Sequence, residues 1–214
     1  DVTLVATSAQ GCVDSITQTV VVAQPVSVDF IGDSVCLGEP IQFNNTSSSG
    51  SSSVQYSWNF GDGSTSSLTS PSYTYSSKGV YTVILQASIS GSNTSCQSSK
   101  TENVEIYERP TANFTFNNEC LSDTVSFVNQ TVYTGGLSNL THSWVLNDGN
   151  LSVNQDVDHK YNLPGLYNVS LEVETIFGCT SDISQQVEIF EMPIASFTAN
   201  NVCYGESSEF TNTS

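Results

Sequence analysis

The sequence predicts an all-β fold in which antiparallel two-sheet sandwiches follow one another as tandem repeats. Three observations predict it: landmark residues recur with a period near 84, short runs alternate apolar with polar residues, and no helical stripe of useful length occurs. A fixed period defines the repeating unit before any fold is assumed. Alternation with period two indicates strands with one buried face, and about seven short strands in such a unit are typical of a sandwich.

The repeat is set first by six cysteines, which form two interleaved series. Cys12, Cys96 and Cys179 are spaced by 84 and 83 residues, and so are Cys36, Cys120 and Cys203. Four further pairs lie 86 residues apart: Trp58 and Trp144, Tyr75 and Tyr161, Gly79 and Gly165, Tyr81 and Tyr167. The period predicts complete repeats at 25–109 and 110–192, the end of a preceding repeat at 1–24, and the start of a following one at 193–214. We therefore expect a window onto a longer array.

The strands within a repeat are predicted from alternation. Tyr81, Val83, Leu85 and Ala87 alternate with outward-facing residues, and Tyr167, Val169, Leu171 and Val173 repeat the pattern one period later. Further short strands are expected in four runs separated by Ser, Gly, Asn and Pro: Val26–Ile31, Ile41–Asn44, Gln55–Phe60 and Asn103–Tyr107. The Ser- and Gly-rich stretch from Thr46 to Ser53 has no apolar anchor and is expected to be an exposed loop.

Composition excludes several classes of partner. Only four Lys and Arg residues face 21 Asp and Glu, which gives a formal net charge of −17. Nucleic acid is therefore excluded as a partner, because binding its phosphates needs clustered Lys and Arg side chains. Docking on an anionic membrane is disfavoured for the same reason. No apolar run approaches the roughly 18 residues of a spanning helix, so membrane insertion is not expected.

The cysteines are predicted to be structural. Each complete repeat holds two, Cys36 with Cys96 and Cys120 with Cys179, and we expect a disulfide within each pair. Cys12 and Cys203 would then have partners outside the sequence. Zinc is the rival interpretation, but no Cys-x-x-Cys pair exists and there are only two histidines. Disulfides would place the protein in an oxidising compartment outside the cytosol.

One motif resembles a known family. Tyr56-Ser57-Trp58-Asn59-Phe60-Gly61-Asp62-Gly63 is followed by Pro71-Ser72-Tyr73-Thr74-Tyr75 and by Gly79-Val80-Tyr81-Thr82-Val83. This is similar to the PKD (polycystic kidney disease) domain, an Ig-like sandwich. The resemblance covers two copies, and the second carries the equivalent residues at Trp144, Asp148, Gly149, His159, Tyr161, Gly165 and Tyr167.

The resemblance implies structural roles for these residues. The aromatic side chains should fill the core, and Asp62-Gly63 should form a hairpin turn. Asn147 stands where the first copy has Gly61, and Asn is well suited to replace Gly at positive φ. His142 and His159 take the places of Tyr56 and Tyr73, so packing and a hydrogen bond are expected of each.

The resemblance also points to a function. PKD repeats with Gly-Cys before the last strand, as at Gly11-Cys12 and Gly178-Cys179, are similar to those of giant surface adhesins from gliding bacteria with type IX secretion. We expect an extracellular spacer at the cell surface, whose partners are neighbouring repeats and also surface polysaccharide or other cell-surface proteins. The alternative is a polysaccharide-binding accessory module of a secreted hydrolase. That alternative needs a row of exposed aromatics, for which only Tyr107, Tyr133 and Tyr204 are candidates.

The sequence gives little support for catalysis, a cofactor or a metal site. No motif for a nucleophile, metalloprotease or phosphate loop is present, so catalysis is not expected. No cofactor is expected either. Calcium is kept as an alternative on the oxygen ligands of Asp156, Asp158, Glu102, Glu105 and Glu108.

Sugar attachment is a further alternative. Ser15, Ser34 and Thr124 lie in Asp-Ser/Thr-aliphatic triplets that resemble the O-glycosylation signal of the same bacterial group. Asn-x-Ser/Thr triplets at Asn45, Asn93, Asn113 and Asn139 are expected by chance in a chain so rich in these residues.

Overall fold

The computed structural model describes residues 1–20, 26–50, 54–89 and 96–214, and the chain divides into two compact units, Asp1–Tyr107 and Glu108–Ser214. The regular elements of both units are strands, apart from a single 3₁₀ turn among the described residues, η1 (Leu137–Asn139). The predicted all-β class of tandem sandwiches is confirmed. No helical segment in the described ranges has the length and apolar character needed to cross a membrane.

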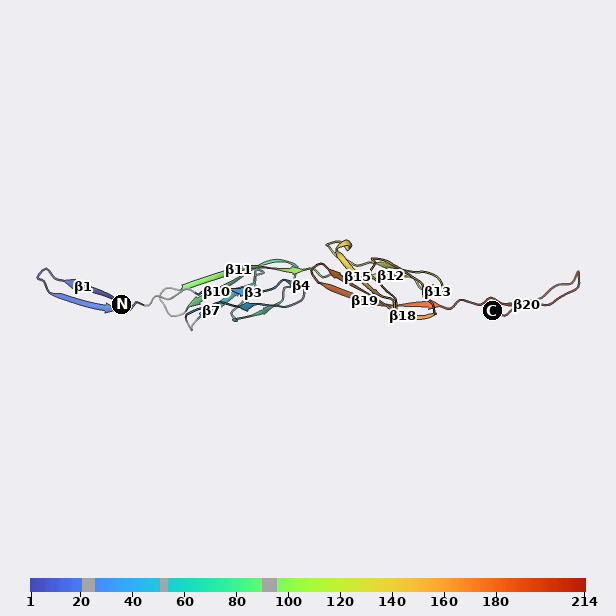
Figure 1. Cartoon of the computed structure of the whole chain (residues 1–214), viewed down its shortest axis with the longest axis horizontal. Coiled ribbons are helices and arrows are strands. Elements are labelled where there is room, and N and C mark those ends of the chain that lie inside the picture. Colours follow the sequence, from blue (N-terminus) through green and yellow to red (C-terminus); the bar gives the residue numbers. More distant parts are fainter. Residues whose placement is uncertain (21–25, 51–53, 90–95) are drawn as a thin grey trace. The chain divides into compact units, whose positions relative to one another are not determined.

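The first unit contains a hairpin followed by one repeat (repeat 1). The larger sheet of repeat 1 has five strands, with β10 between β7 and β11 (Figure 1). Short pairs, β3 with β6 and β5 with β9, form the opposing layer. The strands of the unit are β1 (Val2–Thr7), β2 (Val13–Gln18), β3 (Phe30–Ile31), β4 (Val35–Cys36), β5 (Ile41–Gln42), β6 (Asn44–Asn45), β7 (Val54–Asn59), β8 (Thr65–Ser66), β9 (Ser72–Tyr73), β10 (Gly79–Ile89) and β11 (Cys96–Tyr107).

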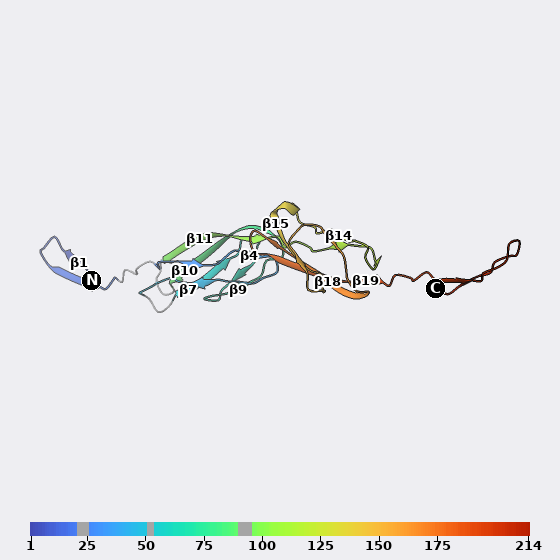
Figure 2. The ribbon, with the colours of Figure 1, turned by 45° about the vertical axis from the view of Figure 1, so that its right-hand side comes forward.

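The second unit repeats this plan (repeat 2) and ends in a second hairpin. Its five-stranded sheet has the order β13-β19-β18-β15-β16, in which β18 and β19 run side by side (Figure 2), and its other sheet has the order β12-β14-β17. The strands are β12 (Phe114–Thr115), β13 (Glu119–Cys120), β14 (Val125–Asn129), β15 (Leu140–Val145), β16 (Leu151–Ser152), β17 (Val157–His159), β18 (Gly165–Thr175), β19 (Thr180–Phe190), β20 (Phe197–Ala199) and β21 (Phe210–Asn212).

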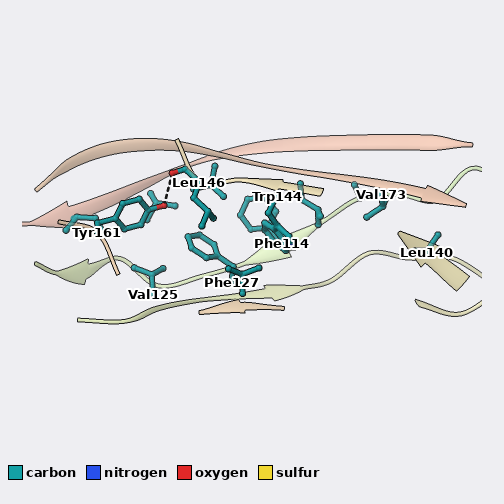
Figure 3. Close-up of a cluster of buried hydrophobic side chains, with 14 residues drawn as sticks. Phe114, Val125, Phe127, Leu140, Trp144, Leu146, Tyr161 and Val173 are labelled. Atoms are coloured by element: carbon teal, nitrogen blue, oxygen red, sulfur yellow. Dashed lines mark hydrogen bonds between the residues drawn. The ribbon is translucent and has the colours of Figure 1, made fainter. Parts of the chain in front are cut away.

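Alternation places the core where the sequence predicts it. Val83, Leu85 and Ala87 of β10 are fully buried. Val80 lies on the opposite face of the same strand and is exposed to solvent. In repeat 2, Phe114, Phe127 and Trp144 from different strands meet in the centre of the sandwich (Figure 3). The largest fully buried side chains of each core are aromatic, and the burial of such apolar surface helps to hold a domain of this size together.

The two terminal hairpins copy parts of a repeat. Val2 lies opposite Gln18, as Val169 lies opposite Gln185, and Phe197 lies opposite Asn212, as Phe114 lies opposite Asn129. The difference is burial. Val169 and Phe114 are buried in repeat 2, whereas Val2 and Phe197 are exposed. The same local sequence therefore forms the same hairpin whether or not its apolar face is covered.

Candidate functional site

The hallmark tryptophans lie in the centres of the two cores. Trp58 and Trp144 are each 0% exposed, and each is met edge-on by a phenylalanine ring, at a centroid distance of 5.0 Å for Phe30 and 5.1 Å for Phe114. Each indole N–H donates a 2.9 Å hydrogen bond to a backbone carbonyl ten residues later, that of Leu68 or Asn154. A buried indole N–H needs such a partner, so both tryptophans have a structural role, with the ring buried and its N–H bonded inside the repeat.

The turn after each tryptophan is organised by an aspartate. Asp62 Oδ1 accepts a 2.9 Å hydrogen bond from the backbone N–H of Ser64, and its Oδ2 accepts a 2.6 Å bond from the Tyr73 hydroxyl. Gly61 and Gly63 have φ of 83° and 95°, the left-handed region that glycine adopts without strain. The Asp-Gly pair therefore makes the turn, and Tyr73 fastens the turn to β9.

Repeat 2 builds the same turn from different residues. Asp148 Oδ1 accepts from the backbone N–H of Asn150 at 3.0 Å, and Oδ2 lies 2.7 Å from His159 Nε2. Asn147 takes φ of 63°, so the predicted replacement of a glycine by asparagine at positive φ is confirmed. The predicted hydrogen bond of His159 is also confirmed, and its ring meets Tyr161 edge-on at 4.7 Å.

Both aspartates titrate below the ordinary carboxyl value. Burial by itself would raise the pKa of Asp62, but the hydrogen bonds from Tyr73 and Ser64 outweigh it and leave that pKa lowered. The pKa of Asp148 is lowered in the same way, by His159 and Asn150 against the effect of burial. A lowered folded-state pKa means that the turn stabilises the fold above the ordinary carboxyl pKa and loses that contribution as pH falls through the folded-state value.

A pair of stacked tyrosines completes each network. The hydroxyl of Tyr75 donates to the carbonyl of Phe60 at 2.8 Å, and that of Tyr161 donates to Leu146 at 3.1 Å, the dashed bond in Figure 3. Tyr81 stacks on Tyr75, and Tyr167 packs at a tilt on Tyr161, with ring centroids 4.0 Å apart in each pair. Burial raises the pKa of Tyr75 and Tyr161 well above the ordinary tyrosine value, so both stay protonated donors.

The two remaining glycines of the motif open the long hairpins. Gly79 and Gly165 are the first residues of β10 and β18, with φ of 144° and 146°. Each of them lies two residues before the stacked tyrosine of its repeat. The hallmark side chains of both copies thus have partners within their own repeat.

His142 only half agrees with its prediction. The side chain is buried within β15, as expected for a residue in the place of Tyr56, but its Nε2 atom has no hydrogen-bond partner. Burial lowers its pKa, against an opposing effect of the carboxylate of Asp156. The predicted hydrogen bond is therefore wrong for this ring nitrogen, because no polar atom of the described residues lies within hydrogen-bond distance of it.

The cysteines contradict the predicted pairing in repeat 1. Cys36 pairs in the sheet with Tyr107 at the end of β11, whereas Cys96 is the first residue of β11 and lies opposite Ile89. The strand between these places spans about 36 Å at ~3.3 Å per residue, and a disulfide needs Cα atoms within about 7 Å. A bond between Cys36 and Cys96 is excluded by the register.

The pairing predicted for repeat 2 is also wrong. Cys120 lies beside Phe190 at the end of β19, while Cys179 directly precedes the first residue of that strand, and Cys120 is a free thiol. Cys36 and Cys179 are both disulfide-bonded. Cys12 and Cys203 are also free thiols, and the prediction that their partners lie outside this sequence stays a prediction. The side chain of Cys96 lies outside the described part.

The acids considered for calcium lie apart and have other partners. Asp156 accepts from the backbone N–H of Asn129 at 2.8 Å, and Asp158 accepts from the Ser126 hydroxyl at 2.6 Å. Three glutamates lie elsewhere: Glu102 pairs with Lys100, Glu105 is exposed, and Glu108 accepts from Thr134. No cluster of three potential ligands forms within the described ranges. Calcium binding stays a prediction.

The predicted sugar-attachment sites are all accessible. Ser15 in β2, Ser34 before β4 and Thr124 before β14 are exposed. Ser34 Oγ also accepts a 2.9 Å hydrogen bond from the backbone N–H of Glu105. Among the Asn-x-Ser/Thr sites, the Nδ2 atom of Asn45 is buried, Asn113 is exposed, and Asn139 donates to the carbonyl of Gly135. Asn93 lies outside the described residues.

The aromatic residues considered for sugar stacking lie on different elements. Tyr107 ends β11 and Tyr133 follows β14, and both are half-buried. Tyr204 lies between β20 and β21 and is fully exposed. Of the three, only Tyr204 therefore has a fully exposed ring.

The fold and this network define a class: tandem β-sandwich repeats of Ig-like type, each locked by a tryptophan, an Asp-Gly turn and a tyrosine pair. The PKD domain family model matches residues 22–106 and 107–190, most of the chain. The chain therefore belongs to the PKD domain family, and the predicted resemblance is confirmed.

Several solved structures are similar to parts of this chain. The PKD1 domain of Vibrio anguillarum Epp is 26% identical over 39% of this chain and 96% of its own, with a TM-score of 0.36. Fibronectin(III)-like modules of Clostridium thermocellum CbhA are 14% identical over 78% of this chain and 94% of their own, with a TM-score of 0.38. BT4661, a SusE-like surface located polysaccharide binding protein from Bacteroides thetaiotaomicron, is 14% identical over 91% of this chain and 42% of its own, with a TM-score of 0.33. At such scores the family assignment rests on the family model alone.

Proposed function

We propose that this chain is a spacer segment of a long, repetitive extracellular adhesin, in which PKD repeats hold a binding region away from the cell surface. The observation that carries the proposal is the use of the hallmark residues. The polar side-chain atoms of these residues form hydrogen bonds inside their own repeat, as Trp58, Asp62 and Tyr75 do in repeat 1. Their counterparts in repeat 2 do the same. Such residues make a durable module, and their chemistry is not directed toward a ligand.

The connection between the repeats supports a spacer. β11 ends at Tyr107 and the first pairing of repeat 2 is the bridge of Thr111 with Val132, so only three residues intervene, one of them Pro110. A Pro-containing connection this short is stiffer than a Gly/Ser linker. Repeats joined in this way propagate as a quasi-one-dimensional array.

Location and charge agree with the proposal. Disulfide-bonded cysteines belong to an oxidising environment, which favours an extracellular protein. The net charge of −17 on this segment would keep neighbouring stalks apart. Assignment to a gliding adhesin that uses type IX secretion is part of the proposal and rests on the Gly-Cys signature of the repeats.

Binding and scattering measurements together test the spacer role. We expect small-angle scattering of the chain to give an extended particle, and a glycan array to show no binding above background. A compact particle would contradict the spacer. Binding of a polysaccharide that is lost on Tyr204→Ala would instead support an accessory module of a secreted hydrolase.

A further inference from the structure

We propose that the core of repeat 2 contains a binding site for a single water molecule, which bridges the two layers of the sandwich between Asn129, Thr131 and His142. The inference follows from three buried polar atoms that the sheet register brings to one level of this repeat. It lies wholly within repeat 2 and does not depend on the spacer role.

Three inward-facing polar side chains of repeat 2 each have an atom without a partner. Asn129, Thr131 and His142 are 6%, 7% and 8% exposed. Within the part of the chain that the structure describes, no hydrogen bond is made by Asn129 Nδ2, Thr131 Oγ1 or His142 Nε2. Buried polar groups in native proteins are bonded to other protein groups or to ordered water, because leaving them unpaired is costly. All three atoms therefore call for a partner.

Two of the three side chains lie together at the end of β14. Alternation buries Phe127, Asn129 and Thr131 on the same face of this segment. Asn129 Oδ1 accepts a 2.8 Å hydrogen bond from the backbone N–H of Thr131. This bond fixes the orientation of the amide, so the unpaired end of Asn129 is its NH₂ group, which can only donate.

The third side chain comes from the opposing layer, and the register shows its level. In the five-stranded sheet, His142 of β15 lies opposite Val173, and Val173 lies opposite Ser181. The hydroxyl of Ser181 accepts a 3.2 Å hydrogen bond from the backbone N–H of Ala112, which leads into β12 of the other layer. The row that contains His142 is therefore joined directly to Ala112.

Ala112 in turn leads to Thr131. Thr111 and Val132 form an antiparallel bridge. The next pair along such a ladder is Ala112 opposite Thr131, because residue numbers rise on one strand as they fall on the other. His142 and Thr131 thus lie on the same level of the sandwich, in layers whose inward side chains meet.

A carboxylate gives the same placement by a second route. Asp156 Oδ1 accepts a 2.8 Å hydrogen bond from the backbone N–H of Asn129. The charge of Asp156 also acts on His142, where it opposes the lowering of the pKa by burial. Because the interaction between charges weakens with distance, Asn129 and His142 lie close to the same carboxylate.

The chemistry of the three atoms selects water as the ligand. Asn129 Nδ2 only donates, the hydroxyl of Thr131 donates and accepts, and Nε2 of a neutral His142 ring does one or the other according to its tautomer. A cation needs an acceptor at each contact, which Nδ2 is not. An anion would be repelled by the nearby carboxylate of Asp156. Water both donates and accepts, and a buried water typically makes about three hydrogen bonds to groups that otherwise lack a partner.

Repeat 1 provides an internal comparison. The counterparts of the three site residues are Asn45, Ser47 and Tyr56. Asn45 Nδ2 is also without a partner among the described residues, but the Ser47 hydroxyl donates to the carbonyl of Asp29 at 3.2 Å. Tyr56, whose ring is larger than imidazole, packs against the core of repeat 1. We therefore expect the water site in repeat 2 and not in repeat 1.

The site accounts for a polar side chain in a place where repeat 1 has an aromatic one. His142 is shorter than a tyrosine, and the water occupies the space that the longer ring would fill. Its hydrogen bonds run from β15 in one layer to the end of β14 in the other. A buried water of this kind is part of the structure and is costly to remove.

Nuclear Overhauser effects between water and the unaltered, isotope-labelled chain test the site directly. We expect effects from a long-lived water to the side-chain amide of Asn129 and to the Hε1 proton of His142, and none to the side-chain amide of Asn45. The absence of a long-lived water at both groups of repeat 2 would overturn the proposal.

Matched variants, compared by oxygen-17 relaxation dispersion of water, test which residues form the site. His142→Tyr installs the residue of repeat 1 and should reduce the number of long-lived buried waters by one. Tyr56→Phe at the equivalent position of repeat 1 should leave the number unchanged, and so should Thr131→Ser, which keeps the hydroxyl. An unchanged number in folded His142→Tyr, or an equal loss in Tyr56→Phe, would overturn the proposal. If His142→Tyr fails to fold, the effects measured on the unaltered chain decide.

Discussion

The two repeats build one network from different residues, and the differences lie on a single path from the turn into the core. Repeat 1 fastens the turn aspartate with a tyrosine hydroxyl, whereas repeat 2 uses an imidazole, Tyr73 against His159. At the turn itself Gly61 is replaced by Asn147, and on the adjoining strand Tyr56 is replaced by His142. The hydrogen-bond geometry is kept while the chemistry of the partner changes, so what the fold requires is a hydrogen-bonding side chain at that position.

The largest effect is expected from the tryptophan that both repeats share. Trp58→Ala should cost repeat 1 about 3–5 kcal/mol, because it leaves a large cavity and frees the carbonyl of Leu68. Hydrogen exchange of the β10 amides measures the loss, while the fluorescence of Trp144 reports separately on repeat 2. The same change at position 144 should cost a similar amount. A cost below about 1 kcal/mol in either repeat would show that the cores are not equivalent.

The turn glycine should separate the repeats next. A Cβ on Gly61 would lie 2.6 Å from the carbonyl oxygen of Thr82, and its φ of 83° already disfavours a side chain. Gly61→Ala should therefore destabilise repeat 1 by about 1–3 kcal/mol, whereas Asn147→Gly in repeat 2 should change stability by well under 1 kcal/mol. Urea unfolding followed by the tryptophan of each repeat measures both. Equal losses of stability for Gly61→Ala and Asn147→Gly would contradict the predicted difference between the two turns.

Mild acid should affect repeat 2 alone. The pKa of His142 is lowered from its ordinary value of 6.5, so the unfolded chain takes up its proton more readily than the folded repeat. Its contribution is complete above pH 6.5 and is lost as pH falls through that value toward the lower folded-state pKa. We expect the melting temperature of repeat 2 to drop by a few degrees, about 2–5 °C, between pH 7.5 and about 5.5, and that of repeat 1 to hold.

His142→Tyr is the matched control for this window, because it restores the residue of repeat 1. The lowered pKa values of Asp62 and Asp148 act only in stronger acid, below the ordinary value of 3.8. An equal drop in the two repeats, or a drop that survives His142→Tyr, would refute the role of this histidine.

The smallest effect is expected on the surface. Lys100 pairs with Glu102 at 2.8 Å in repeat 1, where repeat 2 has Ile183 at the equivalent position of its last strand. Exposed ion pairs contribute little, so Lys100→Ala should leave the denaturation midpoint of repeat 1 almost unchanged. Chemical denaturation at low and high salt checks this, and a larger, salt-insensitive loss would mean that the lysine stem packs on the sheet.

Much of this was predictable from sequence because it depends on local pattern. Alternation predicts that Val83 and Leu85 are buried, and the period predicts that Trp144 is equivalent to Trp58. The positive φ of Asn147 is predictable because asparagine adopts that conformation more readily than most residues. The bond between Tyr73 and Asp62 was not predicted, because eleven residues separate them and only the folded turn brings them together.

The cysteine pairing failed for an instructive reason. A period shows which cysteines are equivalent, and bonds within a repeat or between repeats satisfy it equally well. The choice depends on strand direction, and β4 runs parallel to β11 so that Cys36 lies beside Tyr107 and far from Cys96. Strands β10 and β11 pair with Ile89 opposite Cys96, which puts Cys96 at the end of β11 away from Tyr107.

Pulling single molecules by their two ends under reducing conditions tests most directly the central claim that these repeats serve as mechanically stable spacers. We expect two separate unfolding events, one for each complete repeat, and each should lengthen the chain by on the order of 250 Å at ~3.5 Å per residue. Gradual extension without separate unfolding events would contradict the claim.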